Sequence, residues 1–499
     1  MLLLPMLKPC KLGLLAILTL ASCLAEPKTA APRIWNDRDL AEWATPLAKL
    51  NVRPGHLSEK LYYSLPSADW LRTYPVYFPG REPVGYWQML QNKKPEQLIT
   101  PEARTESEWI AAGKRAFEEL DVPSFRTRDP ELMAKIRSAE KFTKLGGHPQ
   151  KDGTVAGWRW VPTAQGLALT VQECSGCHTR EMPDGSKLFG AQGNDAGDAL
   201  FAEISNEFNK IVFPGDSLAM ATWRQFAVPW IPNDIHGQIK TMDEPTIGKL
   251  LASNPAGTVA RFNGSPWRPT PIVDLIGVKH RKYLDYNGTH RMRGVEDIAR
   301  YAVLVACCDT ADFGSHRILT DKQRTPPYRV PDELAYALAK YIYSLEPPKN
   351  PYVNDPRAAA GRKVFDREGC GGCHPAPFYT NNKLTLAKGF VPPKDHPNRA
   401  DMMLFSIGTE PDAALKTRKG TGLYKVPSLK GLWYRDILTH DGSVGKLEEW
   451  FDPARLRDDY VPKGFKGYQV EHRAVPGHEF GLKLGSEEKG SLMAFLRTL

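Results

Sequence analysis

The stretch Cys370-Gly371-Gly372-Cys373-His374, with its earlier counterpart Cys174-Ser175-Gly176-Cys177-His178, decides how this chain folds. In each stretch, two thiols three positions apart are followed directly by a histidine, which is the spacing for covalent attachment of a c-type haem. Each sulfur adds to one vinyl group of the porphyrin, and the imidazole binds the iron as its proximal ligand. With 8 Cys and 12 His among 499 residues, chance would place only about 0.003 such motifs in the chain. The sequence therefore predicts two haem-attachment sites, in which the four cysteines hold the porphyrins and His178 and His374 bind the iron.

Two other uses of paired cysteines fit the pattern less well. A zinc ribbon brings four thiolates to one ion, usually from pairs about 15–20 residues apart, whereas the pairs here are separated by nearly two hundred positions. A redox-active Cys-x-x-Cys of the thioredoxin type needs no histidine after it and does not recur. Both motifs are therefore interpreted as haem sites.

Length and charge narrow the class of protein. A chain of 499 residues is long enough for two or three hydrophobic cores. The formal net charge is +9, but basic and acidic residues are interleaved, with no basic block and no nucleic-acid-binding motif. We therefore expect no nucleic-acid partner. The positive charge either steers an acidic electron-transfer protein to the surface or is an ordinary solvated surface.

The N-terminus is typical of an export signal. Lys8 and Lys11 precede an apolar run from Leu12 to Ala25, which is too short to span a membrane and suits the apolar part of a secretory signal. The segment Leu20-Ala21-Ser22-Cys23 resembles the lipobox of bacterial lipoproteins, in which Cys23 would be acylated and would anchor the protein to a membrane face. Cleavage after Ala25 is the alternative. Both outcomes predict a location in the periplasm or at the cell surface, where haem c is attached.

Prolines mark the boundary between two units. The segment Glu346-Pro347-Pro348-Lys349-Asn350-Pro351 cannot continue a helix. Asp355 is then placed to cap a new helix, which we expect to run from Ala358 to Arg367 and to end at Gly369, beside Cys370. We expect a signal sequence at 1–25 and a loop-rich N-terminal extension at 26–110. A first haem unit with an insertion follows at 111–346, and a second haem unit at 355–499.

The ends of the two units repeat each other in sequence. Gly166-Leu167-Ala168-Leu169 precedes Cys174 much as Gly361-Arg362-Lys363-Val364 precedes Cys370, and Leu338 to Leu345 matches Leu492 to Leu499 in the placement of apolar residues. A helix that enters the haem motif and a closing helix that crosses it are the two essential helices of a class I cytochrome c. Alternation with a period of two is scarce. We therefore expect a mainly α fold of two tandem class I cytochrome c-like domains, with long loops and an irregular N-terminal extension.

The second half of the chain also resembles a known family. The similar segments are Val426-Pro427-Ser428-Leu429-Lys430-Gly431-Leu432, His440-Asp441-Gly442-Ser443-Val444, Leu447-Glu448-Glu449 and Leu484 to Leu499. They resemble segments of bacterial di-haem cytochrome c peroxidases and MauG-type maturases, and the separation of the haem motifs is nearer to that of longer relatives, the haem-containing rubber oxygenases. The resemblance implies that the haem of the second unit relays electrons and that the haem of the first unit meets peroxide or dioxygen. It also raises calcium, between the two units, as a further cofactor.

The sixth ligand of the His374 haem is a point where this chain departs from the family. In the peroxidases a methionine after the His-Asp-Gly motif takes this place, but no methionine lies between Met403 and Met493 here. The remaining candidates are His440, His472 and His478. His478, in the loop before the closing helix, resembles the bis-histidine arrangement of the rubber oxygenases and is the favoured ligand, with a solvated loop histidine as the alternative. His440 would then lie at the haem edge.

The distal side of the His178 haem is less sharply defined. His290, Met292 and Glu296 fall at the start of a helix expected from Arg291 to Cys307. Binding of iron by His290 or Met292 would close the haem and leave it to carry electrons. Without such a ligand, Glu296 is a weak candidate acid or base for cleavage of an O–O bond, and a salt bridge on the helix surface is the favoured role. Three tryptophans are candidate electron bridges or, alternatively, packing residues: Trp223, Trp230 and Trp267.

Three hypotheses for function follow. The first is an exported di-haem c-type oxidoreductase of peroxidase type, with peroxide or dioxygen as the small-molecule oxidant and a protein as electron donor or acceptor. The second is a non-catalytic electron carrier with both irons six-coordinate. The third is a haem dioxygenase of an apolar substrate, whose entry would be lined by Trp267, Ile272, Val303 and Leu304, residues that ordinary core packing explains equally well.

Overall fold

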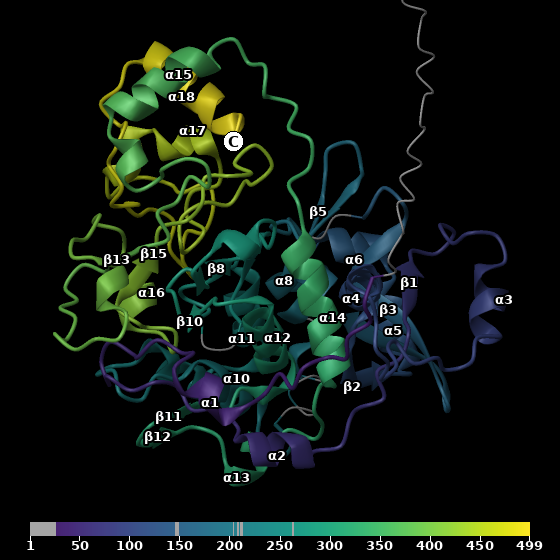
Figure 1. Cartoon of the computed structure of the whole chain (residues 1–499). Coiled ribbons are helices and arrows are strands. Elements are labelled where there is room, and N and C mark those ends of the chain that lie inside the picture. The colour runs from purple at the N-terminus through teal and green to yellow at the C-terminus, as the bar shows by residue number, and fades with distance from the viewer. Residues whose placement is uncertain (1–25, 145–148, 203, 207–208, 210–212, 262–263) are drawn as a thin grey trace, which may run out of the picture.

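A computed structural model describes residues 26–144, 149–202, 204–206, 209, 213–261 and 264–499 (Figure 1). The predicted export signal, including Cys23, lies outside the described residues. Within them, no helix is both long enough and apolar enough to cross a membrane.

Helices are distributed along the whole described chain. They are α1 (Asp37–Ala41), α2 (Glu59–Ser64), α3 (Tyr86–Gln91), α4 (Glu106–Glu119), α5 (Pro130–Ile136), α6 (Ala139–Lys144), α7 (Cys174–Cys177), α8 (Gly197–Ala202), α10 (Leu218–Phe226), α11 (Glu244–Ala252), α12 (Val295–Val303), α13 (Asp321–Arg324), α14 (Asp332–Ser344), α15 (Ala358–Arg367), α16 (Asp412–Leu415), α17 (Leu447–Trp450) and α18 (Ser486–Arg497). Short segments of tighter or wider winding are η1 (Ile235–Thr241), η2 (Val278–His280), η3 (Leu304–Cys308), η4 (Cys370–Gly372), η5 (Arg399–Asp401) and η6 (Pro453–Leu456).

The strands form one larger antiparallel sheet and several small ones. The larger sheet has the order β1 (Tyr74–Tyr77), β3 (Thr154–Thr163), β4 (Gly166–Gln172) and β2 (Asp121–Thr127). A second sheet has the order β14-β13-β15, from Met402–Met403, Leu384–Leu386 and Leu423–Lys425. Two-stranded pairs are β5 (Thr179–Glu181) with β6 (Lys187–Phe189), β7 (Thr258–Val259) with β8 (Thr270–Pro271), β9 (Tyr283–Leu284) with β10 (His290–Arg291), and β11 (Asp312–Phe313) with β12 (His316–Arg317).

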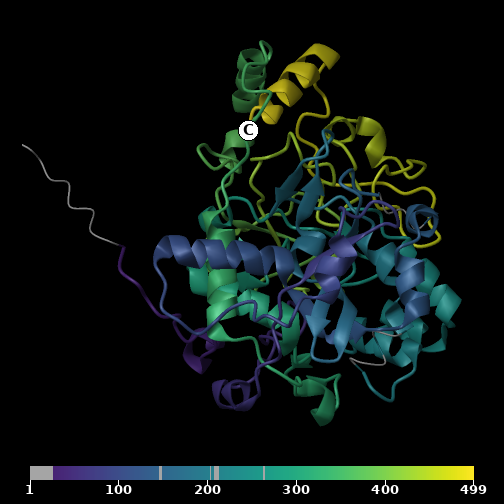
Figure 2. The same cartoon turned by 90° about the vertical axis from the view of Figure 1, so that its right-hand side faces the viewer.

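Two helix crossings organise the molecule. In Figure 2 the blue helix α4 crosses the green helix α14, and above them α15 packs against the yellow helix α18. Each crossing depends on one glycine, because a Cβ at Gly113 would lie 1.8 Å from the carbonyl oxygen of Ala337, and a Cβ at Gly361 would lie 1.9 Å from that of Ser491. Since no side chain fits at these distances, the backbones of the two helices in each pair touch directly.

The predicted second-unit helix and both closing helices are confirmed. Helix α15 spans Ala358–Arg367 as expected, and Gly369, at φ 73°, ends it in the left-handed conformation that favours glycine. The residue before α15 is Arg357 rather than Asp355, although the Asp355 side chain accepts a hydrogen bond from the Arg357 N–H at 2.9 Å. The matched segments at 338–345 and 492–499 lie largely in α14 and α18.

The expectation of a mainly α fold is wrong, because helix accounts for 34% and strand for 14% of the structure, which is a mixed class. The segment Gly166–Leu169, read above as part of a helix entering the motif, lies in strand β4. Its neighbour β3 contains Trp158-Arg159-Trp160, in which both tryptophans are buried and the arginine is half-buried. That alternation is the period of a strand, and its aromatic residues favour the pleated surface of a sheet.

The predicted helix from Arg291 to Cys307 is also corrected. His290 and Arg291 form strand β10, and the helix begins only at Val295. From Leu304 to Cys308 the winding widens to a π-helix.

The N-terminal extension forms part of the first core. Trp35, Trp43 and Tyr62 are fully buried and belong to one hydrophobic cluster with Phe117 of α4 and Leu338 of α14. The second crossing has a smaller core of its own, formed by Val364, Phe365, Leu492, Phe495 and their neighbours. The extension is therefore packed against the first helix crossing rather than being a separate layer.

Candidate haem-attachment sites

The two Cys-x-x-Cys-His motifs adopt the same local turn. Helix α7 carries the first motif and η4 the second, and in each the histidine N–H donates to the carbonyl of the first cysteine, at 2.9 Å in both. This i to i+4 turn brings both sulfurs and the imidazole to one side of a short segment. The sequence repeat is therefore also a repeat of backbone geometry.

Each motif imidazole is held by a backbone carbonyl. Nδ1 of His178 lies 2.9 Å from the carbonyl oxygen of Val273, and Nδ1 of His374 lies 3.1 Å from that of Tyr379. Because a carbonyl only accepts, Nδ1 carries the proton and Nε2 keeps its lone pair. Burial lowers the pKa of His178 to about 4 and also lowers the pKa of His374, so both rings are neutral at pH 7. Metal-bound histidines adopt this tautomer.

The four motif cysteines are free and protonated. Burial raises the pKa of all four thiols, Cys174, Cys177, Cys370 and Cys373. For Cys370 the pKa is about 11. A thioether forms when S–H adds across a vinyl group of a porphyrin, so these thiols suit covalent attachment. Together with the two imidazoles, these donors fit covalently attached haem.

His478 faces the second motif. Its ring centre lies 6.5 Å from that of His374, with an angle of 57° between the rings. Two imidazoles on opposite sides of one metal ion, each with a metal–nitrogen bond of about 2.0–2.1 Å, have ring centres about 6.5 Å apart. Burial, and then the neighbouring His374, lower the pKa of His478 to about 4, so this ring is neutral as well.

The backbone holds His478 in a constrained position. Its φ is 47°, a left-handed conformation that is uncommon outside glycine, although histidine adopts it more often than most residues. The N–H donates to the carbonyl of Ile407 at 2.8 Å, and Arg455 donates to the carbonyl of His478 at 2.8 Å. Constrained residues of this kind concentrate at functional sites.

One contact of His478 bears on its tautomer. The indole N–H of Trp450 lies 3.2 Å from Nδ1 of His478. An indole N–H only donates, so this hydrogen bond requires a lone pair on Nδ1 and places the proton on Nε2. For Nε2 to bind iron, the hydrogen bond from Trp450 must therefore break, or the imidazole must rotate by half a turn about its bond to Cβ.

The other two candidate ligands in the second unit, His440 and His472, make different contacts. His440 packs on Tyr424, with ring centres 4.3 Å apart, and its Nε2 lies 3.7 Å from a carboxylate oxygen of Glu410. His472 keeps 48% of its side chain exposed and lies beside Glu471.

His290 lies in an aromatic cluster of the first unit. Its ring centre is 4.2 Å from that of Trp43, 5.6 Å from that of Tyr301 and 6.1 Å from that of His56. Burial and then His56 lower the pKa of His290 to about 3, and its Nε2 is buried without a hydrogen-bond partner among the described residues. His56 was not singled out from the sequence, because a lone histidine in a loop carries no pattern.

The remaining candidates of the first unit are placed as follows. Met292 is buried in the first core cluster, and Glu296 is half-buried in the first turn of α12. Trp223 stacks beneath the Lys240 ammonium at 4.0 Å, Trp230 packs on Phe313 and Trp267 on His236. Ile272, Val303 and Trp267 are buried. These contacts fit the packing roles given above for the three tryptophans and the apolar residues.

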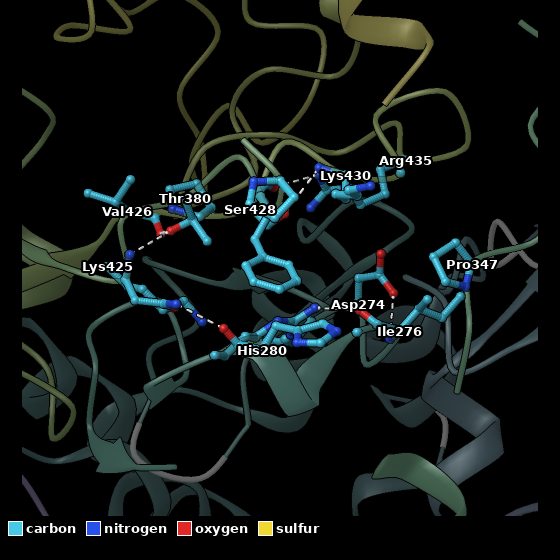
Figure 3. A pocket seen from close by; sticks show the side chains of 18 of the residues that line it. Asp274, Ile276, His280, Pro347, Thr380, Lys425, Val426, Ser428, Lys430 and Arg435 are labelled. Atoms are coloured by element: carbon cyan, nitrogen blue, oxygen red, sulfur yellow. Dashed lines mark hydrogen bonds between the residues drawn. The ribbon is translucent and has the colours of Figure 1, made fainter. Parts of the chain in front are cut away.

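A cavity of about 230 Å³ lies between segments of the first and second units. Figure 3 shows Asp274, Ile276 and His280 on one wall, and Thr380, Lys425, Ser428 and Arg435 on the other. Val273, whose carbonyl holds His178, also lines the cavity, and Thr380 follows Tyr379, whose carbonyl holds His374. The cavity thus adjoins the supports of both motif histidines.

Acidic residues do not gather into a metal site in the part of the chain that the structure describes, where no group of three or more His, Cys, Asp or Glu side chains is arranged to hold an ion. The calcium ion stays a prediction.

Comparisons with known proteins add little. No protein-family profile matches the chain, and no curated protein matches it. One solved structure that matches is a chain of hydrazine synthase from Kuenenia stuttgartiensis, with 14% identity, covering 50% of this chain and 79% of that chain at a TM-score of 0.30. A TM-score at this level does not establish a common fold, so function rests on the residues themselves.

Proposed function

We propose that the protein is an exported di-haem c-type oxidoreductase of the peroxidase–MauG superfamily, in which electrons pass between a haem at His374 and a haem at His178 that reacts with peroxide or dioxygen. The observation that carries the proposal is the repeat of one donor set. Both motifs pair two protonated thiols with a neutral imidazole whose Nδ1 faces a backbone carbonyl.

The residues of each motif and their neighbours would hold and orient one haem. Cys174 and Cys177 would hold one porphyrin, and Cys370 and Cys373 the other, through thioethers. When bound, the haems would supply one-electron redox chemistry and, at an iron with a free coordination position, reaction with a small oxidant. The carbonyls of Val273 and Tyr379 would orient the proximal imidazoles and raise their basicity.

The two sites would differ in their distal ligands. His478 lies at a ring-centre distance from His374 that suits two imidazoles on one metal, which supports a closed relay site. In the first unit, the Nε2 of His290 is buried without a hydrogen-bond partner among the described residues. We propose an open site at His178, with Glu296 as a weak candidate for its acid or base, and His290 as the weak candidate for a distal ligand if the site is closed.

The experiment begins with the holoprotein isolated from an exporting host. Intact mass and a pyridine haemochrome assay should give two covalent haems per chain. Carbon monoxide added to the reduced protein should then change the spectrum of one haem and leave the other unchanged. A chain without covalent haem would overturn the whole proposal, whereas two haems that are both inert to carbon monoxide would identify an electron carrier.

A further inference from the structure

Three half-buried basic side chains line the cavity between the two motifs. Arg281 comes from the segment after η2, Lys425 from the end of β15, and Arg435 from the loop that follows. Burial, and then the positive charges of Arg281 and Arg435, outweigh the opposing effect of Asp285 and lower the pKa of Lys425 to about 7. Burial also lowers the pKa of Arg281.

The three cations make only neutral contacts. Arg281 donates to the carbonyl of Ile276 at 3.0 Å, Lys425 to that of Tyr283 at 3.3 Å, and Arg435 to that of Ser428 at 2.9 Å. The Nε of Arg435 is buried without a partner among the described residues, in which Asp285 pairs with Lys419 and Asp401 with Lys282. All three side chains are half-buried, and Asp274 acts on Arg281, and Asp285 on Lys425, without forming an ion pair. The cluster therefore has an excess of positive charge that a bound anion would stabilise.

The two acidic side chains that line the cavity, Asp274 and Glu346, have partners other than the three cations. Asp274 accepts hydrogen bonds from the Tyr434 hydroxyl at 2.7 Å and from the Ile276 N–H at 3.0 Å. Glu346, at the rim, pairs with Lys279. The other titratable groups on the walls are Tyr286, His280 and Lys430, and none of them supplies a negative charge at pH 7, since burial raises the pKa of Tyr286 to about 12.

We propose that Arg281, Lys425 and Arg435 form a shared carboxylate-binding cluster that takes the propionates of both haems. The inference rests on the function proposed above. It follows from position, because Val273 and Thr380 connect the cavity to the two motif histidines, and from charge, because carboxylates would pair three cations that the protein leaves unpaired. Arginine is suited to this role because its guanidinium binds a carboxylate through two parallel hydrogen bonds.

A shared cluster has a measurable consequence. A buried positive charge near an iron stabilises the reduced state, which carries one more negative charge. Removal of a cation from the cluster should therefore move the reduction potentials of both haems to more negative values. A residue that served only one haem would move one potential.

The test uses the holoprotein and three single variants, Arg281→Gln, Lys425→Gln and Arg435→Gln, studied by spectroelectrochemical titration after haem content is confirmed. We expect two haems per chain and a negative shift of both potentials in each variant. Lys430→Gln is the matched control, because Lys430 lines the same cavity but is exposed, so solvent screens its charge and both potentials should stay unchanged.

Three results would overturn the cluster without touching the haem assignment. The first is two haems with unshifted potentials in all three variants. The second is a shift of the wild-type potentials on addition of acetate that Lys425→Gln abolishes, since the cluster would then hold a free anion. If the glutamine variants do not fold, resonance Raman spectra of the wild type decide, and propionate bands typical of solvated carboxylates are the third contrary result. Absence of haem from the wild type would instead contradict the proposed function.

Discussion

The two helix crossings are built alike but are connected to their haem motifs differently. Helix α15 leads into Cys370 through only Glu368 and Gly369. Helix α4 ends at Glu119, and the chain then runs through β2, α5, α6, β3 and β4 before it reaches Cys174. Yet the N–H of Glu173 donates to the carbonyl of Leu120 at 2.9 Å, so the excursion returns to the residue where it left α4.

The comparison shows that the crossing, and not the continuity of the chain, places each motif. Pairing of Asp121 with Gln172 closes the excursion at its base, and the larger sheet is built almost entirely within it. The strand β1 from the N-terminal extension completes that sheet. An inserted sheet can therefore lie between a helix and its motif without changing how they meet.

The largest effect should come from removal of the thiols of one motif. Cys174→Ala with Cys177→Ala, and separately Cys370→Ala with Cys373→Ala, should each leave one covalent haem per chain instead of two, measured by intact mass and haemochrome absorbance. Because the donor sets are separate, the remaining haem should keep its spectrum. Cys307→Ala is the control and should keep both haems. Loss of both haems in either double variant would mean that the two units do not mature independently.

The next effect tests the glycines at the crossings. Gly113→Ala and Gly361→Ala place a Cβ within 1.9 Å of a carbonyl oxygen of the facing helix, and overpacking of this kind costs about 1–3 kcal/mol or more. We expect lower urea midpoints for both variants. Gly490→Ala is the matched control in α18, where a Cβ would meet nothing within 4 Å, and the helical alanine should add about 0.5–1 kcal/mol. Equal urea midpoints for all three variants would show that the close approach of the helices does not contribute to stability.

A smaller effect should follow from His478→Ala, which leaves the crossings intact. If His478 closes the site at His374, the variant should bind carbon monoxide at both reduced haems, whereas the wild type binds it at one. His472→Ala, at an exposed position, should behave as the wild type. Unchanged carbon monoxide binding in His478→Ala would exclude this ligand and leave His440 as the candidate in the second unit.

The smallest effect concerns an ion pair between the units. Burial would raise the pKa of Asp285, but Lys419 at 3.6 Å and hydrogen bonds from Thr289 and Tyr301 outweigh it and hold the pKa at about 2. Because this pKa is below the unfolded value of about 3.9, the pair stabilises the fold above that pH, and about 2 kcal/mol is lost as pH falls through 2. Unfolding free energies from urea titrations between pH 5 and 2 should show this slope, and Asp285→Asn should flatten it. A wild-type slope that persists in the variant would assign the acid sensitivity to other carboxylates.

Local patterns predicted the local features and failed for those made by distant contacts. The motif spacing, the stop at Gly369 and the helical placement of apolar residues in α14 and α18 are all set within a few positions of the chain. Helix α4 was not identified as the partner of α14, because the excursion separates it from Cys174 and nothing in its own sequence names its partner. The β4 segment was assigned to a helix because it stands where α15 stands in the other unit, although the alternation in β3 favoured strands.

The candidate site follows the same rule. Cys174, Cys177, His178 and their counterparts in the second motif are predicted from spacing alone. The approach of His478 to His374 was expected only from the family resemblance, and the carbonyls of Val273 and Tyr379 carry no sequence signal because they are backbone atoms. Arg281, Lys425 and Arg435 come from separate segments, so only the folded chain brings their charges together.

The order of the elements along the chain also sets a sequence of events in time. Each thiol pair is synthesised before the helix that closes over it, since α14 follows the first motif and α18 the second. Each motif is therefore synthesised before its partner helix exists. Under the proposed function, a lyase that joins porphyrin to thiol would reach the thiols in that interval, and the glycine-to-carbonyl contacts would form after the haem is attached.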